Sequence, residues 1–149
     1  QSSESTPGGS NPQAKEIYQY LITKYGFTPA QAAGIVGNMQ VESGLKTSAL
    51  NPREGAIGLC QWLGGRRRNL ERFAATRGPV TDWKVQVDFM MQELRGSESG
   101  AYRYLKAAQT PAAAAAVFDQ YYERSSGEAR GQRIANANRI AASMGSVSA

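Results

Sequence analysis

Apolar residues recur at the spacing of an α-helix along most of this chain. Ile17, Leu21 and Tyr25 lie four residues apart, so they share one face of a helix. Pro12 favours the first turn of that helix, and Gly26 favours its end. The pattern therefore predicts a helix close to the start of the chain.

A second helix is predicted between Thr28-Pro29, a typical helix start, and Gly44. Gly34 and Gly37 lie inside this segment, where glycine lowers helix propensity. Their presence is best explained by the close approach of a neighbouring helix. We therefore expect this helix to be packed tightly against at least one other.

Residues 45–65 interrupt the helical pattern and are rich in Asn, Pro, Gly and Ser. A short apolar stretch at 57–63 predicts a long loop that contains a small β-hairpin or an irregular equivalent. Helical patterns resume afterwards and predict helices at about 67–77, 81–95, 101–108, 111–123 and 128–144. The expected fold is mostly α, with about six helices and a small β-hairpin or loop insertion after the second helix.

The ends of the chain differ in composition from its middle. Residues 1–10 are mainly Ser, Gly, Pro and Thr, which predicts a flexible linker or arm, and residues 145–149 are interpreted as a flexible tail. Residues 11–144 are the expected domain, which is long enough to bury one core. No apolar run is long enough to predict membrane insertion. We interpret the chain as a mature form or as a domain carried on something larger.

The histidine and cysteine content limits which catalytic groups and metal ligands this chain can supply. The 149 residues include no histidine and one cysteine, Cys60. A zinc hydrolase would lack its usual ligands, and Cys–His or Ser–His–Asp hydrolases would lack their base. We expect no metal and no cofactor, and we interpret Cys60 as a packing residue. Any proton chemistry would then fall to carboxylates, Lys or Tyr.

The formal net charge of +5 favours polyanionic partners, which include nucleic acid and the bacterial wall. Three consecutive arginines, Arg66 to Arg68, are interpreted as a solvated helix start with one or two salt bridges. No nucleic-acid-reading motif is present, so we expect no nucleic-acid partner. A helical interaction or nucleic-acid module remains an alternative of another class.

Among the carboxylates, Glu42 has the most distinctive setting. It ends an apolar helix just before Ser43-Gly44. The negative end of the helix dipole and partial burial both disfavour an ionised carboxylate, so both raise its pKa. A carboxyl that stays protonated near neutral pH can donate a proton to a leaving oxygen.

Two motifs carry a resemblance to a known family. The first reads Gly-Ile-Val-Gly-Asn-Met-Gln-Val-Glu-Ser-Gly over 34–44, and the second reads Gly-Ala-Ile-Gly-Leu-Cys-Gln-Trp over 55–62. Together they resemble the goose-type lysozyme and lytic transglycosylase superfamily. The chain is more similar still to the phage tail lysozyme family, which shares Gly-Arg-Arg at 65–67 and Tyr-Glu-Arg at 122–124. The resemblance covers about residues 14–142.

The resemblance implies a lysozyme-like fold and a muramidase activity on peptidoglycan. Glu42 would protonate the glycosidic oxygen between N-acetylmuramic acid and N-acetylglucosamine. Gln61 and Trp62 would line the substrate cleft, although Trp62 is equally well interpreted as a core aromatic. Tyr121 and Tyr122 are further substrate-binding candidates, as loose equivalents of the tyrosine in a late Ala-Tyr-Asn-Ala-Gly motif of many transglycosylases.

The identity of a second catalytic group stays open. A hydrolase usually has a second carboxylate. Glu54 is the best candidate, although it can also be interpreted as a solvated turn residue paired with Arg53. Asp119 and Glu123 are further candidates from the late helices. Lytic transglycosylases need only one Glu, because the 6-hydroxyl of the substrate replaces water; the missing Ala-Tyr-Asn-Ala-Gly motif favours hydrolysis.

The biological setting follows from the resemblance alone. The expected partners are peptidoglycan glycan strands and other domains or subunits of a phage tail. The expected location is the virion, or the bacterial cell wall and periplasm after export. A non-catalytic wall-binding module on the same scaffold is a further alternative, against which the glutamate at the motif position argues.

Overall fold

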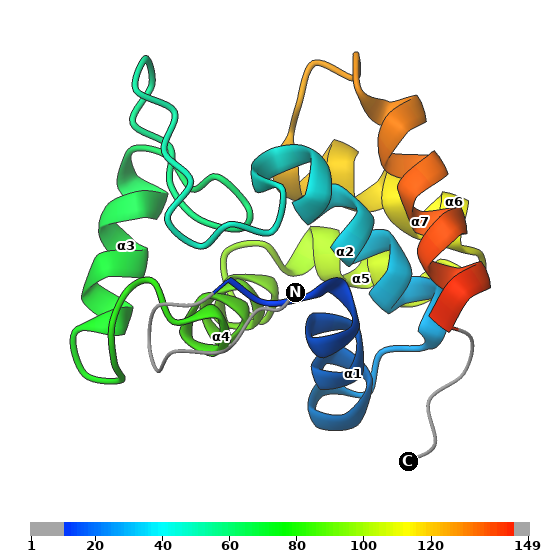
Figure 1. Cartoon of the computed structure of the whole chain (residues 1–149), viewed down its shortest axis with the longest axis horizontal. Helices are drawn as coiled ribbons and strands as arrows, with labels where there is room; N and C mark the ends of the chain where they lie inside the picture. The colour runs from blue at the N-terminus through cyan, green and yellow to red at the C-terminus, as the bar shows by residue number, and fades with distance from the viewer. Residues whose placement is uncertain (1–10, 145–149) are drawn as a thin grey trace.

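The computed structural model describes residues 11–144, in which helices account for all regular secondary structure (Figure 1). The prediction of a mostly α fold is therefore confirmed. The predicted linker at 1–10 and tail at 145–149 lie outside the described residues. Seven α-helices and one π-helical segment follow in the order α1 (Ala14–Tyr25), α2 (Pro29–Ser43), α3 (Gly65–Ala74), α4 (Trp83–Leu94), α5 (Ser99–Ala107), α6 (Pro111–Val117), η1 (Phe118–Glu123) and α7 (Arg130–Met144).

The insertion after the second helix is an irregular loop, so of the two predicted forms the β-hairpin is not seen and the irregular equivalent is found. Among residues 11–144, β-pairing is limited to two isolated bridges, which join Leu50 to Ile57 and Ile57 to Trp62. The four residues between Ile57 and Trp62 form a turn, with positive φ angles at Gly58 (86°) and Gln61 (56°), so most of the apolar stretch lies in a turn rather than in paired strands. The tip of the loop stands away from the helices (Figure 1).

Helix α2 lies at the centre of the packing and contacts α1, α6 and α7. Its two interior glycines allow these contacts, as the sequence predicted. A Cβ atom added at Gly34 would lie 2.6 Å from the backbone nitrogen of Ala115 in α6, and one at Gly37 would lie 2.9 Å from the carbonyl oxygen of Arg133 in α7. The position of α2 is therefore set by backbone-to-backbone proximity on two sides.

The start of α2 is fixed by its own side chains. The Thr28 hydroxyl accepts a hydrogen bond from the Gln31 backbone nitrogen (3.2 Å), and the Gln31 side chain accepts one from the Thr28 backbone nitrogen (3.1 Å). Gln31 also reaches across to the carbonyl oxygens of Lys106 and Ala108. These bonds fix where α2 begins and join it to the end of α5.

Replacing Thr28 with alanine is expected to lower the free energy of unfolding by about 1 kcal/mol, because one helix-cap hydrogen bond is lost. Urea-induced unfolding followed by circular dichroism measures the change. Thr23→Ala is the matched control, because the Thr23 hydroxyl bonds only to the Gln19 carbonyl oxygen on an exposed helical turn. An equal loss in both variants would contradict the capping role.

A second group of buried side chains joins α3, α4, η1 and the loop around Glu93. Glu93 is 6% exposed, so its charge needs partners within the protein. It accepts hydrogen bonds from Arg66 Nε (3.0 Å) and Nη2 (2.8 Å), from the Tyr122 hydroxyl (2.6 Å) and from Trp62 Nε1 (3.2 Å). These four bonds satisfy the buried charge and hold the end of the loop against the helices.

Candidate active site

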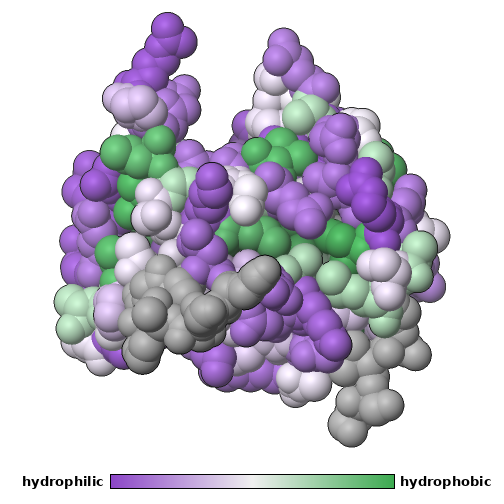
Figure 2. Space-filling view, in the orientation of Figure 1, coloured by the Kyte–Doolittle hydropathy of each residue, from purple (hydrophilic) through white to green (hydrophobic). Residues whose placement is uncertain are grey.

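A cleft of about 580 Å³ opens between the end of α2, the loop that follows it, and the segment joining η1 to α7. Figure 2 shows the hollow between two projections, one formed by the loop and one by the η1–α7 segment. Most of the side chains that line it are polar or charged. The full set of lining residues is Glu42, Asn51, Glu54, Ala56, Gln61, Leu63, Arg66, Glu123, Arg124, Ser125 and Arg133.

Glu42 lies in the last turn of α2, as the sequence predicted. The helix ends at Ser43, and Gly44 follows in the left-handed conformation with φ 62°. The Ser43 hydroxyl donates to the carbonyl oxygen of Met39 or of Leu59, each 3.0 Å away, and so joins the helix end to the loop. Glu42 is thereby held at the point where the helix meets the cleft.

The carboxyl of Glu42 is 18% exposed. Burial raises its pKa above the ordinary value for glutamate, and the negative charges of Asp119 and Glu54 add to this effect. The guanidinium of Arg133 acts in the opposite direction but does not cancel it. Glu42 therefore keeps its proton to a higher pH than an exposed glutamate does, which is the property that a general acid needs.

Arg133 from α7 orients this carboxyl. Its Nη1 atom lies 2.9 Å from Glu42 Oε2 and also donates to Asn38 Oδ1 at 3.0 Å. Its Nε atom lies 3.3 Å from Asp119 Oδ1, and Asp119 is paired with Arg130 at 2.9 Å. Asp119, one of the candidates for a second carboxylate, is fully buried and bonded in this network, and it does not line the cleft.

Gln61 lines the cleft as predicted, with a strained backbone φ of 56°. Its side-chain nitrogen donates to the carbonyl oxygens of Ala49 (3.2 Å) and Gly58 (3.0 Å). Both amide hydrogens are thereby used within the loop. Any contact of this side chain with a ligand would thus be made through Oε1, as a hydrogen-bond acceptor.

The three predicted aromatic residues do not line the cleft in this structure. Trp62 is 1% exposed and Tyr122 is fully buried, and Trp62 Nε1 donates to the Tyr122 hydroxyl at 2.9 Å. Of the two interpretations of Trp62, the structure matches the core aromatic. Tyr121 is not among the residues that line the cleft, and its ring stacks on Tyr104 with ring centroids 4.3 Å apart. Their rings are committed to packing, so none presents a flat face to a sugar there.

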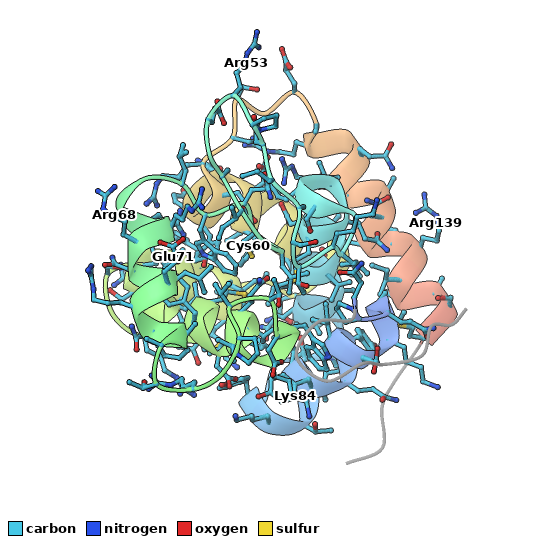
Figure 3. All side chains as sticks on the ribbon, turned by 60° about the vertical axis from the view of Figure 1, so that its left-hand side comes forward. Arg53, Cys60, Arg68, Glu71, Lys84 and Arg139 are labelled. Atoms are coloured by element: carbon cyan, nitrogen blue, oxygen red, sulfur yellow. The ribbon has the colours of Figure 1, made fainter. Side chains whose placement is uncertain are left out.

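Glu54 and Glu42 line the same cleft. Glu54 lies in an exposed turn that Asn51 stabilises, because Asn51 Oδ1 accepts hydrogen bonds from the backbone nitrogens of Arg53 (3.0 Å) and Glu54 (3.3 Å). Arg53 at this turn projects from the loop tip (Figure 3). No ion pair joins Glu54 to Arg53 within residues 11–144, so the structure offers Glu54 to the cleft as an exposed carboxylate.

Sequence reasoning missed Arg133, although a signal was present. Asn136, Ala137 and Ile140 are buried, and Arg133 lies three, four and seven residues before them, on the same face of α7. A charged residue on a buried helical face requires a charged or polar partner. That partner, Glu42, is 91 residues earlier in the chain, a pairing that helical periodicity cannot reveal.

Residues 11–144 contain no cluster of three or more acidic, cysteine or histidine side chains that could hold a metal ion. No helix in this range has both the length and the apolar character needed to cross a lipid bilayer.

The cleft of this helical domain gathers carboxyl groups around the end of its central helix, and carboxyl groups are the groups that glycosidases use. The family model for phage tail lysozyme matches residues 12–144, so the chain belongs to the phage tail lysozyme family. This confirms the resemblance that the two motifs indicated, and it supports a lysozyme-like role in degrading peptidoglycan. No curated protein matches the chain.

Proposed function

We propose that this protein cleaves the β-1,4 bond between N-acetylmuramic acid and N-acetylglucosamine, with Glu42 as the general acid. The observation that carries the proposal is the partly buried carboxyl of Glu42, whose pKa is raised and which lies in a polar cleft of about 580 Å³. A protonated carboxyl in this position can donate its proton to the leaving glycosidic oxygen.

We propose hydrolysis as the outcome, with Glu54 as the second carboxylate. Both glutamates line the same cleft, and an exposed, solvated carboxylate has access to the water molecule that hydrolysis consumes. Gln61 contributes a hydrogen-bond acceptor to the glycan, held in place by its two bonds to the loop. No cofactor is required for this chemistry.

A lytic transglycosylase is the second candidate, and the Glu42–Arg133 ion pair favours it. Arg133 Nη1 lies 2.9 Å from Glu42 Oε2, so it stabilises the carboxylate that remains after proton donation. That carboxylate can then accept the proton of the substrate's 6-hydroxyl group. The same glutamate would serve both steps, and the product would carry a 1,6-anhydro ring.

We also propose that the activity serves local penetration of the cell wall by a phage tail. Membership of the phage tail lysozyme family supports this setting. The proposed partners are glycan strands of peptidoglycan and other domains or subunits of the tail. The proposed locations are the virion and, for an exported form, the bacterial wall or periplasm.

The decisive experiment is mass spectrometry of fragments that the protein releases from purified peptidoglycan, with Glu42→Gln as the comparison. Fragments ending in reducing N-acetylmuramic acid, absent with the variant, would establish a hydrolytic muramidase. Fragments ending in 1,6-anhydro sugars would establish a lytic transglycosylase. If several wall types bind both proteins and release nothing, the protein is a wall-binding module and the enzymatic proposal fails.

Replacing Glu54 with glutamine is expected to lower the hydrolytic rate by about 100-fold, the lower end of the range for loss of a general base. Initial rates of fragment release between pH 4 and pH 9 measure it. Glu128→Gln is the matched control, because Glu128 is also exposed but does not line the cleft. A retained rate would show that Glu54 is not the second catalytic group. Even in that case, the alkaline limit of activity of Glu54→Gln should fall slightly, because the charge of Glu54 raises the pKa of Glu42 in the wild type.

A further inference from the structure

Glu123 is a third carboxyl of the same cleft, and its surroundings differ from those of Glu42 and Glu54. It is the last residue of η1 and lines the cleft directly before Arg124, whose backbone has a strained φ of 56°. Its Oε2 atom is buried and has no hydrogen-bond partner among the described residues. Irregular π-helical turns of this kind often occur at functional sites.

The charged and titratable groups that act most strongly on Glu123 come from three helices and the loop. They are Glu42 on α2, Arg133 on α7, Arg66 on α3 and the Cys60 thiol in the loop. Both guanidinium groups are already paired, Arg133 with Glu42 and Asp119, and Arg66 with Glu93. No ion pair to Glu123 forms within the described part of the chain, so no cation is dedicated to it.

An ionised carboxylate with a buried, unpaired oxygen is costly, and the neutral acid avoids most of that cost. Burial raises the pKa of Glu123 well above the ordinary value, and the charge of Glu42 is the next largest cause. Arg133, Arg66 and the Cys60 contact lower it without reversing the shift. The unpaired oxygen and the pairing of the neighbouring cations thus both favour the protonated, neutral form of Glu123.

We propose that Glu123 is a second proton-holding carboxyl of the cleft, which stays neutral while the neighbouring Glu42 ionises. The order follows from the contacts, because Glu42 has an arginine nitrogen at 2.9 Å, whereas Glu123 has no ion pair within the described residues and a buried oxygen without a partner. The two groups titrate as a coupled pair whose first ionisation belongs to Glu42. Glu123 is thus a positioning residue that acts through Glu42.

The catalytic consequence rests on the proposed role of Glu42 as general acid. Glu42 becomes negatively charged when it gives its proton to the leaving oxygen. A carboxylate beside it would oppose that charge, whereas a neutral carboxyl does not. By staying neutral, Glu123 therefore avoids a further rise in the pKa of Glu42, which would make it harder for Glu42 to give up its proton.

Carbon-13 NMR of protein labelled at the glutamate carboxyl carbons tests the order of ionisation. The Glu42→Gln and Glu123→Gln variants assign the two signals. In the wild type, Glu123 is expected to keep the shift of a protonated acid to a pH well above the midpoint of Glu42. Glu42→Gln should lower the midpoint of Glu123 by about one pH unit or more, because the largest opposing charge is removed. Glu123→Gln should leave the midpoint of Glu42 unchanged.

The proposal would be overturned if Glu123→Gln shifted the midpoint of Glu42 while Glu42→Gln left the midpoint of Glu123 unchanged. A Glu123 signal that titrates at or below the midpoint of Glu42 would overturn it as well. Glu128→Gln is the control and should move neither signal. If Glu123→Gln does not fold, wild type and Glu42→Gln alone still determine the order. The NMR result is also separate from activity: a protein that releases no fragments loses the proposed function, while the ionisation order is still measured.

Discussion

The Glu42→Gln variant is expected to cleave peptidoglycan about 1,000-fold more slowly than the wild type, within the range found for loss of a general acid. Glutamine has nearly the same shape and accepts the same hydrogen bond from Arg133, but it has no proton of suitable acidity to donate. Binding of intact peptidoglycan should therefore persist. Initial rates of fragment release and a pull-down on purified walls separate the two effects.

The same variant is expected to keep its stability, which distinguishes lost chemistry from lost folding. The pKa of Glu42 is raised in the folded state, so its ionised form is disfavoured there relative to the unfolded chain. Its favourable contribution is complete below the unfolded pKa and is lost as the pH rises through the folded pKa. Glutamine resembles the protonated form at every pH, so the variant should be at least as stable as the wild type at pH 8.

Urea unfolding at pH 4 and pH 8 measures this dependence, with Glu128→Gln as the exposed control. The wild type should lose stability relative to Glu42→Gln as the pH rises between these values. If the variant is less stable at pH 8, the Arg133 ion pair outweighs burial, and the explanation for the raised pKa is wrong. If the variant keeps its cleavage rate, another carboxyl supplies the proton.

Local signals predicted the helices well, because they act within one or two turns. Thr28-Pro29 and Gly44 marked both ends of α2, and Gly34 and Gly37 correctly indicated close helix packing. The short apolar stretch at 57–63 did not distinguish a β-hairpin from an irregular loop, because four of its residues form the turn between Ile57 and Trp62 and leave only isolated bridges. The pattern identified an insertion, and backbone conformation decided its form.

The site was predictable in part, since a motif identifies residues but not the distant groups that surround them. Glu42, Glu54 and Gln61 line the cleft as expected. The resemblance placed Trp62 at the substrate cleft, and a core aromatic was the equal alternative. Its indole nitrogen donates to Glu93, which lies 31 residues later in the chain. Such buried polar pairs depend on tertiary packing, which a single sequence does not specify.

The second large effect is expected at Gly34, where alanine should lower the free energy of unfolding by about 3 kcal/mol. The added methyl group would lie 2.6 Å from the Ala115 backbone nitrogen and from Ala114 Cβ, so α2 and α6 must separate. The Asn38 side chain donates to the carbonyl oxygens of Gly34 (2.9 Å) and Ala115 (3.0 Å), across the same contact. Asn38 also accepts from Arg133, so the displacement would reach the group that orients Glu42.

Thermal unfolding followed by circular dichroism measures the loss, which corresponds to a fall in Tm of roughly 10 °C for a domain of this size. Gly131→Ala in α7 is the matched control: its added Cβ meets no atom within 4 Å, so higher helix propensity should leave stability unchanged or raise it by about 0.5 kcal/mol. Equal stability of the two variants would mean that α6 can move away from α2 without lowering the free energy of unfolding. A Gly34→Ala protein that folds but cleaves slowly would instead show that the helix contact serves the alignment of Glu42 and Arg133 as well as the core.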